Sequence, residues 1–205
     1  MRTLRSQQGE ITPSKIVCVG RNYVAHIEEL GNAIPEQMVL FLKPNSAIGE
    51  GLASQREGEP LHYEAELCFL VEQGRFAAVA IGLDLTRRQL QSRLKKAGLP
   101  WERAKAFDGS AVFGAFVPVP DPLPTLALEL AIDGRIVQVG DTSLMLYPPT
   151  EILAEVQRCM TLEDGDIVMT GTPAGVGEVP PGARFEGKVR VGEDVLATAE
   201  WTAAS

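Results

Sequence analysis

The chain has 205 residues, of which 45% are hydrophobic and 22% charged. This composition excludes a disordered or fibrous protein and suffices for a domain with a buried core. Nineteen Lys and Arg face 27 Asp and Glu, and the formal charge of −8 excludes a global attraction to nucleic acid or anionic membranes. No apolar stretch approaches the roughly 18 residues of a membrane span, and the N-terminal segment lacks the apolar core of a secretory signal. We therefore expect a cytoplasmic protein without nucleic-acid or membrane partners.

The three cysteines, Cys18, Cys68 and Cys159, are odd in number and widely spaced. Each is set among apolar neighbours. This pattern predicts buried free thiols in a reducing compartment, and neither a disulfide framework nor a zinc site.

Two short apolar runs come first in chain order. Residues 15–19 and 38–42 end at Gly20 and Pro44, which is typical of buried strands. We therefore expect two buried strands.

The segment after the first strand predicts a short helix that carries a histidine and a glutamate. Asn22 is expected to cap this helix and Gly31 to close it. His26 and Glu29 are three residues apart and share a helix face, so the carboxylate can hold the imidazole and raise its basicity. This arrangement is half of a general-base dyad. The alternative is an ordinary surface ion pair.

Residues 61–71 alternate between apolar and polar side chains, which predicts a strand with two chemically different faces. Glu64 and Glu66 share the polar face about 7 Å apart at Cα, so their carboxylates can converge on one cation. Residues 72–75 resemble a turn, and a second strand follows them and ends at Asp84. If the two strands pair as a hairpin, Asp84 returns beside Glu64.

Carboxylates this close repel one another, and a divalent ion is the simplest partner that keeps them ionised in a partly buried place. An all-oxygen set of Glu64, Glu66 and Asp84 suits a hard cation, Mg²⁺ first, with Mn²⁺ or Ca²⁺ also compatible. The alternative is a solvated polar strand face, which is common in half-exposed strands.

Two further helices are expected later in the chain. One covers residues 87–97 and stops before Gly98, and the other runs from an N-cap at Thr150 to Met160. Between them, Lys105 could be a buried cation that faces a carboxylate, although a single Lys usually faces solvent.

Short strands and tight turns dominate the remainder of the chain. Hairpins are predicted within residues 126–139, around the favoured Asp133-Gly134 turn, and within residues 188–199. The 14 prolines and 20 glycines are spread along the chain. We therefore expect a mixed, mainly β architecture with a few short helices in a single domain over residues 1–205, with residues 1–14 as an N-terminal arm.

A glycine-rich loop at residues 170–177 follows an apolar strand. Such a loop can present backbone N–H groups to an anion. It lacks the Lys followed by Ser or Thr that a nucleotide-phosphate loop requires, so a nucleotide site is not expected.

Together these segments resemble the fumarylacetoacetate hydrolase family, and in particular its small single-domain members that act as acylpyruvate hydrolases and oxaloacetate decarboxylases. The resemblance spans Lys15 to Trp201. Its six motifs, in the family's order, are KIVCVGRNYVAHIEE, VLFLKPNSA, LHYEAEL, GLDLTRRQLQ, KKAGLPWERAKAFDGSA and GDIVMTGTPAGVG. The segment between Glu66 and Asp84 and the loop at residues 49–60 are shorter than is usual in the family. Both departures affect the contacts expected at the edge of the active site, and therefore the size of the substrate.

The resemblance implies a twisted β-roll that forms one catalytic domain and usually assembles as a homodimer. It implies a Mg²⁺ or Mn²⁺ site at the three carboxylates named above, in agreement with the strand pattern. It also implies that His26, oriented by Glu29, activates water and that Lys105 stabilises negative charge. Gln91 and Thr172 are implied to hold the substrate.

The activity implied by the resemblance is metal-dependent hydrolysis of a C–C bond in acylpyruvate-type β-diketo acids, which releases pyruvate and a carboxylic acid. Decarboxylation of oxaloacetate would pass through the same enolate. A metal-dependent isomerase of unsaturated 2-oxo diacids is the alternative, and it would shuttle a proton without breaking a C–C bond. A non-enzymatic role would be favoured if the protein bound neither a divalent ion nor a small 2-oxo acid.

Overall fold

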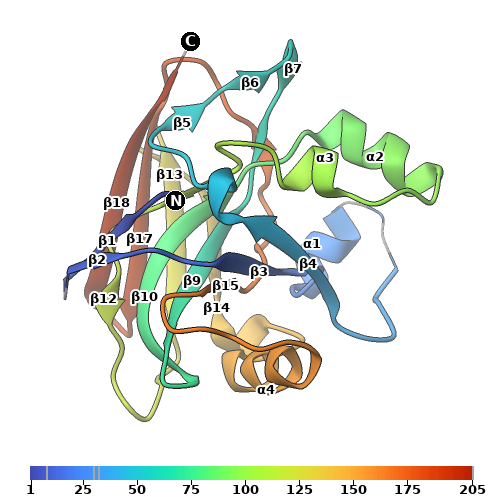
Figure 1. Ribbon diagram of the computed structural model, residues 1–205. Helices are drawn as coiled ribbons and strands as arrows, with labels where there is room; N and C mark the ends of the chain where they lie inside the picture. Colours follow the sequence, from blue (N-terminus) through green and yellow to red (C-terminus); the bar gives the residue numbers. More distant parts are fainter. Residues whose placement is uncertain (8, 30, 32, 205) are drawn as a thin grey trace.

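Two β-sheets packed face to face form the body of the protein (Figure 1). The computed structural model describes residues 1–7, 9–29, 31 and 33–204. Within this part of the chain, the first sheet has seven strands in the order β11-β10-β9-β15-β3-β4, with β12 beside β10, and the second has five in the order β14-β13-β17-β18-β5. The first sheet comprises β3 (Lys15–Gly20), β4 (Val39–Pro44), β9 (Ala65–Glu72), β10 (Arg75–Asp84), β11 (Ala111–Phe113), β12 (Val117–Pro118) and β15 (Ile167–Met169). The second comprises β5 (Leu52–Ala53), β13 (Ala127–Ile132), β14 (Arg135–Asp141), β17 (Arg184–Val191) and β18 (Asp194–Ala204).

The main hydrophobic core lies between the two sheets. Alternate side chains of β9 and β10 meet alternate side chains of β13 and β17, because successive residues of a strand point to opposite faces. Each fully buried Leu, Ile or Phe of this core stabilises the fold by about 1.5–3 kcal/mol relative to an exposed one. Gly187 of β17 allows the close approach, since a Cβ there would lie 2.8 Å from Ile81 Cδ1. The core includes Leu67, Phe69, Val79, Ile81, Leu128, Leu130, Phe185 and Val189.

Four α-helices within the described residues flank the sheets, namely α1 (Val24–Glu29), α2 (Arg88–Lys96), α3 (Glu102–Lys105) and α4 (Pro149–Cys159). Helix α2 ends as predicted, since Gly98 has a left-handed φ of 66°. Helix α4 packs through Ile152 and Val156. The predicted N-cap at Thr150 is wrong, because α4 begins at Pro149, whose ring already sets the φ of a first helical residue.

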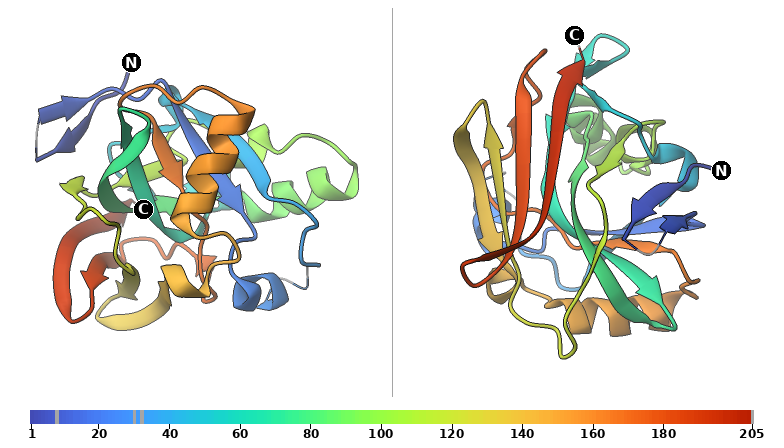
Figure 2. Two further views of the ribbon diagram at one scale, coloured as in Figure 1. Left: turned by 90° about the horizontal axis from the view of Figure 1, so that it is seen from below. Right: turned by 90° about the vertical axis from the view of Figure 1, so that its left-hand side faces the viewer.

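Short strand pairs and two 3₁₀ turns complete the described chain. Residues 4–6 and 9–11 pair as antiparallel strands that project from the body (Figure 2), and backbone hydrogen bonds join Arg5 and Gln7 to Phe116. The remaining elements are β1 (Leu4–Ser6), β2 (Gly9–Ile11), β6 (Gln55–Arg56), β7 (Glu59–Pro60), β8 (His62–Tyr63), β16 (Gly177–Glu178), η1 (Asn45–Ala47) and η2 (Thr142–Leu144). Among the described residues, no helix is long and apolar enough to cross a membrane.

The mainly β architecture predicted from the sequence is confirmed, as are its hairpins. Residues 127–141 and 184–204 form the two later hairpins, and β9 pairs with β10 around a turn at Gln73 and Gly74. The predicted strand at residues 61–71 is divided at Glu64 into β8 and β9.

The cysteine prediction is correct for two residues and wrong for the third. Cys18 and Cys68 are free and buried, and burial raises the pKa of both thiols. Cys159 is free but exposed. It is the last residue of α4, and its apolar sequence neighbours do not cover it.

Candidate active site

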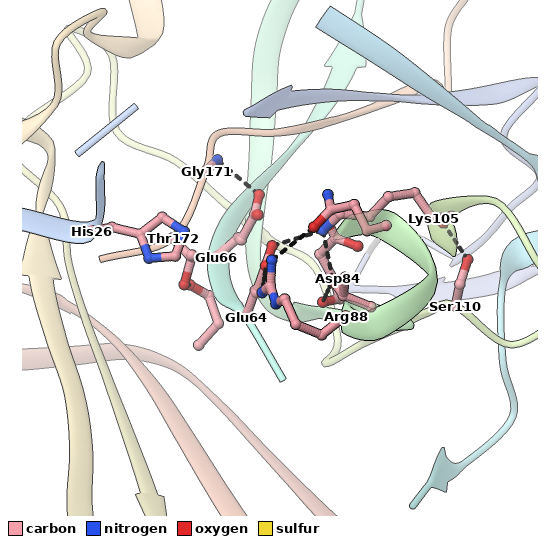
Figure 3. Close-up of polar contacts among 12 residues, drawn as sticks. His26, Glu64, Glu66, Asp84, Arg88, Lys105, Ser110, Gly171 and Thr172 are labelled. Atoms are coloured by element: carbon pink, nitrogen blue, oxygen red, sulfur yellow. Dashed lines mark hydrogen bonds and ion pairs between the residues drawn. The ribbon is translucent and has the colours of Figure 1, made fainter. Parts of the chain in front are cut away.

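Three buried carboxylates meet where the β9–β10 hairpin ends (Figure 3). Glu66 lies in β9, Glu64 directly precedes that strand, and Asp84 is the last residue of β10. The backbone N–H of Asp84 donates to the carbonyl of Glu64 at 2.8 Å, so the predicted return of Asp84 is confirmed. One oxygen from each carboxylate lies within 4.8 Å of the others.

Lys105 forms ion pairs with both Glu64 and Asp84, and Arg88 forms an ion pair with Glu64. Lys105 Nζ donates to Glu64 Oε2 at 2.8 Å, to Asp84 Oδ2 at 2.7 Å and to Thr86 Oγ1 at 2.6 Å. Arg88 Nη2 donates to Glu64 Oε1. Burial raises the pKa of Glu64, but the ammonium of Lys105 and the guanidinium of Arg88 outweigh it and hold the pKa well below its usual range. Lys105 is therefore a buried cation facing carboxylates.

Glu66 has no such partner. Its side chain is 2% exposed, and its Oε2 accepts a 2.7 Å hydrogen bond from Gly171 N–H. Within the described residues, no cation forms an ion pair with it. Burial and the neighbouring charges of Asp84 and Glu64 raise its pKa. A buried carboxylate that lacks a counter-ion beside two others fits a hard divalent cation, which prefers oxygen ligands.

Lys43 is a functional candidate that the sequence analysis missed. Lys43 is 0% exposed. Its Nζ lies 2.8 Å from Asp84 Oδ1 and forms an ion pair with it, although the geometry is not that of a hydrogen bond. The same Nζ donates to the carbonyl and hydroxyl of Ser110, each at 3.1 Å, and to the carbonyl of Lys105. In the sequence, Lys43 appears only as a charged residue at the end of an apolar strand. Ordinary strands often end in this way.

His26 and Glu29 lie on helix α1 as predicted. His26 Nδ1 is 3.2 Å from Glu29 Oε2, and the other oxygen of Glu29 accepts a 2.9 Å hydrogen bond from Gly175 N–H. The imidazole is 6% exposed and its Glu29 partner is fixed by the glycine-rich loop, so the pair differs from an ordinary surface ion pair.

The prediction that Asn22 caps helix α1 is wrong. Its amide donates to the carbonyls of Tyr147 and Thr170, at 3.0 and 2.8 Å, and its Oδ1 accepts from Tyr147 N–H at 2.8 Å. These long-range bonds use the side chain that a cap would need. Gly31 closes the helix as predicted, with φ 60° and a hydrogen bond from its N–H to Glu28 O. Leu30 and Asn32 lie outside the described residues.

Gln91 and Thr172 are both buried. Gln91 Oε1 accepts from Arg88 Nη1 at 2.8 Å. Thr172 Oγ1 donates to the carbonyl of Ala65 at 2.8 Å and accepts from Gln138 Nε2 at 2.9 Å. The glycine-rich loop does present N–H groups to anions, as its composition suggested, and these anions are the carboxylates of Glu66 and Glu29.

A small cavity of about 50 Å³ brings these groups together. Every predicted site residue lines it except Glu29, which contacts it through His26. A larger cavity of about 620 Å³ shares Phe41, Trp101 and Lys105 with it. The lining of the small cavity includes His26, Glu64, Glu66, Asp84, Gln91, Lys105 and Thr172, together with Arg21, Arg88 and Lys95.

Comparison with known proteins gives consistent matches over almost the whole chain. Residues 15–200 match the family described as fumarylacetoacetate hydrolase C-terminal. An oxaloacetate tautomerase from Escherichia coli is 41% identical over 187 residues, covering 82% of this chain and 85% of the relative. A mitochondrial oxaloacetate tautomerase from Homo sapiens is 40% identical over 188 residues, covering 83% and 85%. The crystal structure of fumarylpyruvate hydrolase from Pseudomonas aeruginosa, in complex with Mn²⁺ and pyruvate, is 30% identical with a TM-score of 0.89, covering 99% of this chain and 95% of that one.

Proposed function

Because the chain belongs to the fumarylacetoacetate hydrolase family, we propose that it is a metal-dependent enzyme that enolises small 2-oxo acids, with oxaloacetate tautomerisation as its main reaction. The observation that carries this proposal is the convergence of three buried carboxylates, a buried lysine and a buried histidine on one small cavity. The similarity to two oxaloacetate tautomerases supports the choice of reaction.

Glu64, Glu66 and Asp84 would hold the divalent ion, Mg²⁺ or Mn²⁺, with Ca²⁺ also compatible with oxygen ligands. The Mn²⁺ of the fumarylpyruvate hydrolase structure supports a divalent ion in this fold. The ion supplies a Lewis acid that polarises the 2-oxo group of the substrate. Glu64 and Asp84 also fix the ammonium of Lys105 at this place, where it stabilises negative charge on the substrate oxygen.

His26 carries the proton in this proposal. Its Nδ1 is engaged by Glu29, which leaves Nε2 for the substrate. The C3 proton of oxaloacetate passes to Nε2, the C–H electron pair forms the C2–C3 double bond, and the keto π pair moves to the C2 oxygen. The His26 imidazolium then gives up its Nε2 proton to the C2 oxygen, which yields the enol and restores the neutral base. The reverse sequence returns the keto acid.

Hydrolysis of an acylpyruvate is the second candidate, supported by the similarity to fumarylpyruvate hydrolase. In this reaction His26 removes a proton from water, and the resulting hydroxide attacks the C4 carbonyl. The C3–C4 bond then breaks, its electron pair forms the pyruvate enolate, and a carboxylic acid is released. An isomerase would need the proton transfer without this bond cleavage.

A substrate panel with Mg²⁺ present tests the proposal. We expect the enol absorbance of oxaloacetate to decay faster with the enzyme than without it. Pyruvate and CO₂ release from oxaloacetate and acetylpyruvate separates decarboxylation and hydrolysis from tautomerisation. Catalysis of none of these reactions would contradict the proposal.

Replacing Glu29 by Gln is expected to lower kcat roughly tenfold or more while KM changes little. The amide keeps the bond from Gly175 but loses the charge that holds the His26 imidazole in position for proton transfer. Steady-state kinetics of Glu29→Gln, with Glu28→Gln as the control on the same helix, measures this. A large rise in KM with unchanged kcat would show instead that Glu29 only helps to hold substrate.

We also infer that residues 1–205 form one catalytic domain, that the protein acts in the cytoplasm and, from the family resemblance, that it is a homodimer. Light scattering of the purified protein measures its assembly state. A monomer at working concentration would contradict the inferred dimer.

A further inference from the structure

Lys43 is a buried cation that the proposed reaction does not use. It lies in β4, its side chain is 0% exposed, and it does not line the small cavity. Burying an ammonium group is costly unless charge and hydrogen bonds compensate for it. Its three N–H groups have three acceptors, namely the carbonyl of Lys105 and the carbonyl and hydroxyl of Ser110, and Asp84 Oδ1 lies 2.8 Å away. The side chain therefore joins β4 to the end of α3, to the segment before β11 and to the end of β10.

Helix α3 carries Lys105 to the carboxylates, although the helix has only four residues. A helix of this length is not stable by itself, so contacts with the rest of the fold must fix its position. Lys105 is its last residue, where the backbone carbonyl has no partner within the helix. That carbonyl accepts from Lys43 Nζ and, at 2.8 Å, from Ser110 Oγ. The backbone of Lys105 is thus held by groups outside the helix.

Strand β4 contacts Lys105 at its backbone and at its ammonium group. Phe41 and Lys43 are two residues apart and share one face of the strand. Lys105 Nζ lies 5.5 Å from the centroid of the Phe41 ring, and Lys43 binds the Lys105 carbonyl. From this position the Lys105 side chain reaches Glu64 and Asp84 (Figure 3).

Ser110 connects the same contacts to the end of β10. Its carbonyl accepts a 2.9 Å hydrogen bond from the N–H of Leu85, the residue after Asp84. Asp84 Oδ1 has no hydrogen-bond partner among the described residues, because the N–H groups of Lys43 are directed to other acceptors. Lys43 therefore gives Asp84 a neighbouring charge, while Lys105 gives it a hydrogen bond, to Oδ2 at 2.7 Å.

We propose that Lys43 is a positioning residue for Lys105, which fixes the Lys105 backbone so that the ammonium group of Lys105 faces the substrate oxygen. This inference rests on the proposed function, in which Lys105 stabilises negative charge on that oxygen. A displacement of about 1 Å at such a group can lower a rate about 100-fold. Lys43 does not line the cavity, so it acts through Lys105 and not on the substrate.

A double-mutant cycle with an unreactive ligand tests this role. Oxalate resembles the enolate of a 2-oxo acid and carries the negative charge that Lys105 would stabilise. With Mn²⁺ present, calorimetry should give an oxalate Kd at least about tenfold higher in Lys43→Met and in Lys105→Met than in the wild type, the scale of one charge-assisted hydrogen bond. The double variant should bind oxalate no more weakly than Lys105→Met, because Lys43 has no effect without the ammonium group that it positions.

A second variant keeps every charge in place. Ser110→Ala removes one of the two donors to the Lys105 carbonyl, so it should raise the oxalate Kd in the same direction by a smaller factor. Lys15→Met is the matched control, since Lys15 lies on the neighbouring strand β3, pairs with Asp166 and does not line the cavity. This control should lower thermal stability and leave the oxalate Kd unchanged.

The affinity for Mn²⁺ separates positioning from a general loss of structure. Lys43→Met removes a positive charge beside Asp84 and thus a source of repulsion for a cation. Mn²⁺ should therefore bind this variant at least as tightly as the wild type, although oxalate binds more weakly. Weaker binding of both would indicate a damaged site and would overturn the positioning role.

The remaining outcomes distinguish this role from the proposed function. Additive losses in the double variant would show that Lys43 acts on the ligand directly, and an unchanged oxalate Kd in Lys43→Met and Ser110→Ala would show no action at all. Either result would overturn the positioning role. Non-additive losses in a protein that does not turn over oxaloacetate would support the role and overturn the function. A wild-type protein that binds neither Mn²⁺ nor oxalate would overturn both.

Discussion

Glu66→Gln is expected to lower kcat/KM for oxaloacetate at least about 100-fold, because it removes one of three oxygen ligands of the proposed metal and with it the Lewis acid. The amide has nearly the shape of the carboxylate, and the single contact from Gly171 N–H can be kept through its oxygen. The fold should therefore survive. Initial rates over a Mg²⁺ titration measure the loss. EDTA should abolish the wild-type activity, and Mg²⁺ or Mn²⁺ should restore it.

Glu59→Gln is the matched control for this variant. Glu59 is also a buried glutamate, but it pairs with Arg87 and accepts from Leu90 N–H outside the cavity. Its loss should reduce thermal stability without changing the Mg²⁺ dependence. Full activity of the wild-type protein in the presence of EDTA would contradict the metal requirement.

His26→Ala is expected to suppress tautomerisation and acylpyruvate hydrolysis by about 10²-fold or more, the usual scale for losing a general base. Decarboxylation of oxaloacetate should fall less, because loss of CO₂ generates the enolate without a base. Rates of enol decay, acetylpyruvate cleavage and CO₂ release compare the three reactions in one variant. An equal loss in all three rates would contradict the general-base role. It would show instead that His26 is needed to close the site for any of these reactions.

Two variants complete the comparison. His62 is the only other histidine of the sequence. Its Nε2 lies 3.9 Å from Glu178 Oε1, and the residue does not line the cavity. His62→Ala should therefore leave the three rates nearly unchanged. Lys105→Met should damage all three, since each passes through an enolate whose charge the ammonium stabilises.

The carboxylate cluster could be predicted from the sequence because local signals determine it. Alternation places Glu64 and Glu66 on one strand face, and the glycine turn at Gln73–Gly74 allows an antiparallel return of a strand that ends at Asp84. The His26–Glu29 pair is also local, since it depends on one turn of helix.

Other parts of the site depend on contacts distant in sequence. Lys43 is buried against Asp84 and Ser110 only because β4 and the segment after α3 approach each other in the fold. The Asn22 side chain forms hydrogen bonds with Tyr147 and Thr170, more than 120 residues away in the sequence. These bonds replace the local helix cap that the sequence predicts. The parallel pairing of β15 with β3 likewise has no short-range signal.

Titration of Mn²⁺ into the metal-free protein, followed by the electron paramagnetic resonance signal of free Mn²⁺, tests the central claim most directly. The account predicts one ion bound per chain, displaced by excess Mg²⁺, and a greatly weakened site in Glu66→Gln but not in Glu59→Gln. A wild-type protein that binds no Mn²⁺, or a Glu66→Gln variant that binds it as tightly as the wild type, would contradict the account.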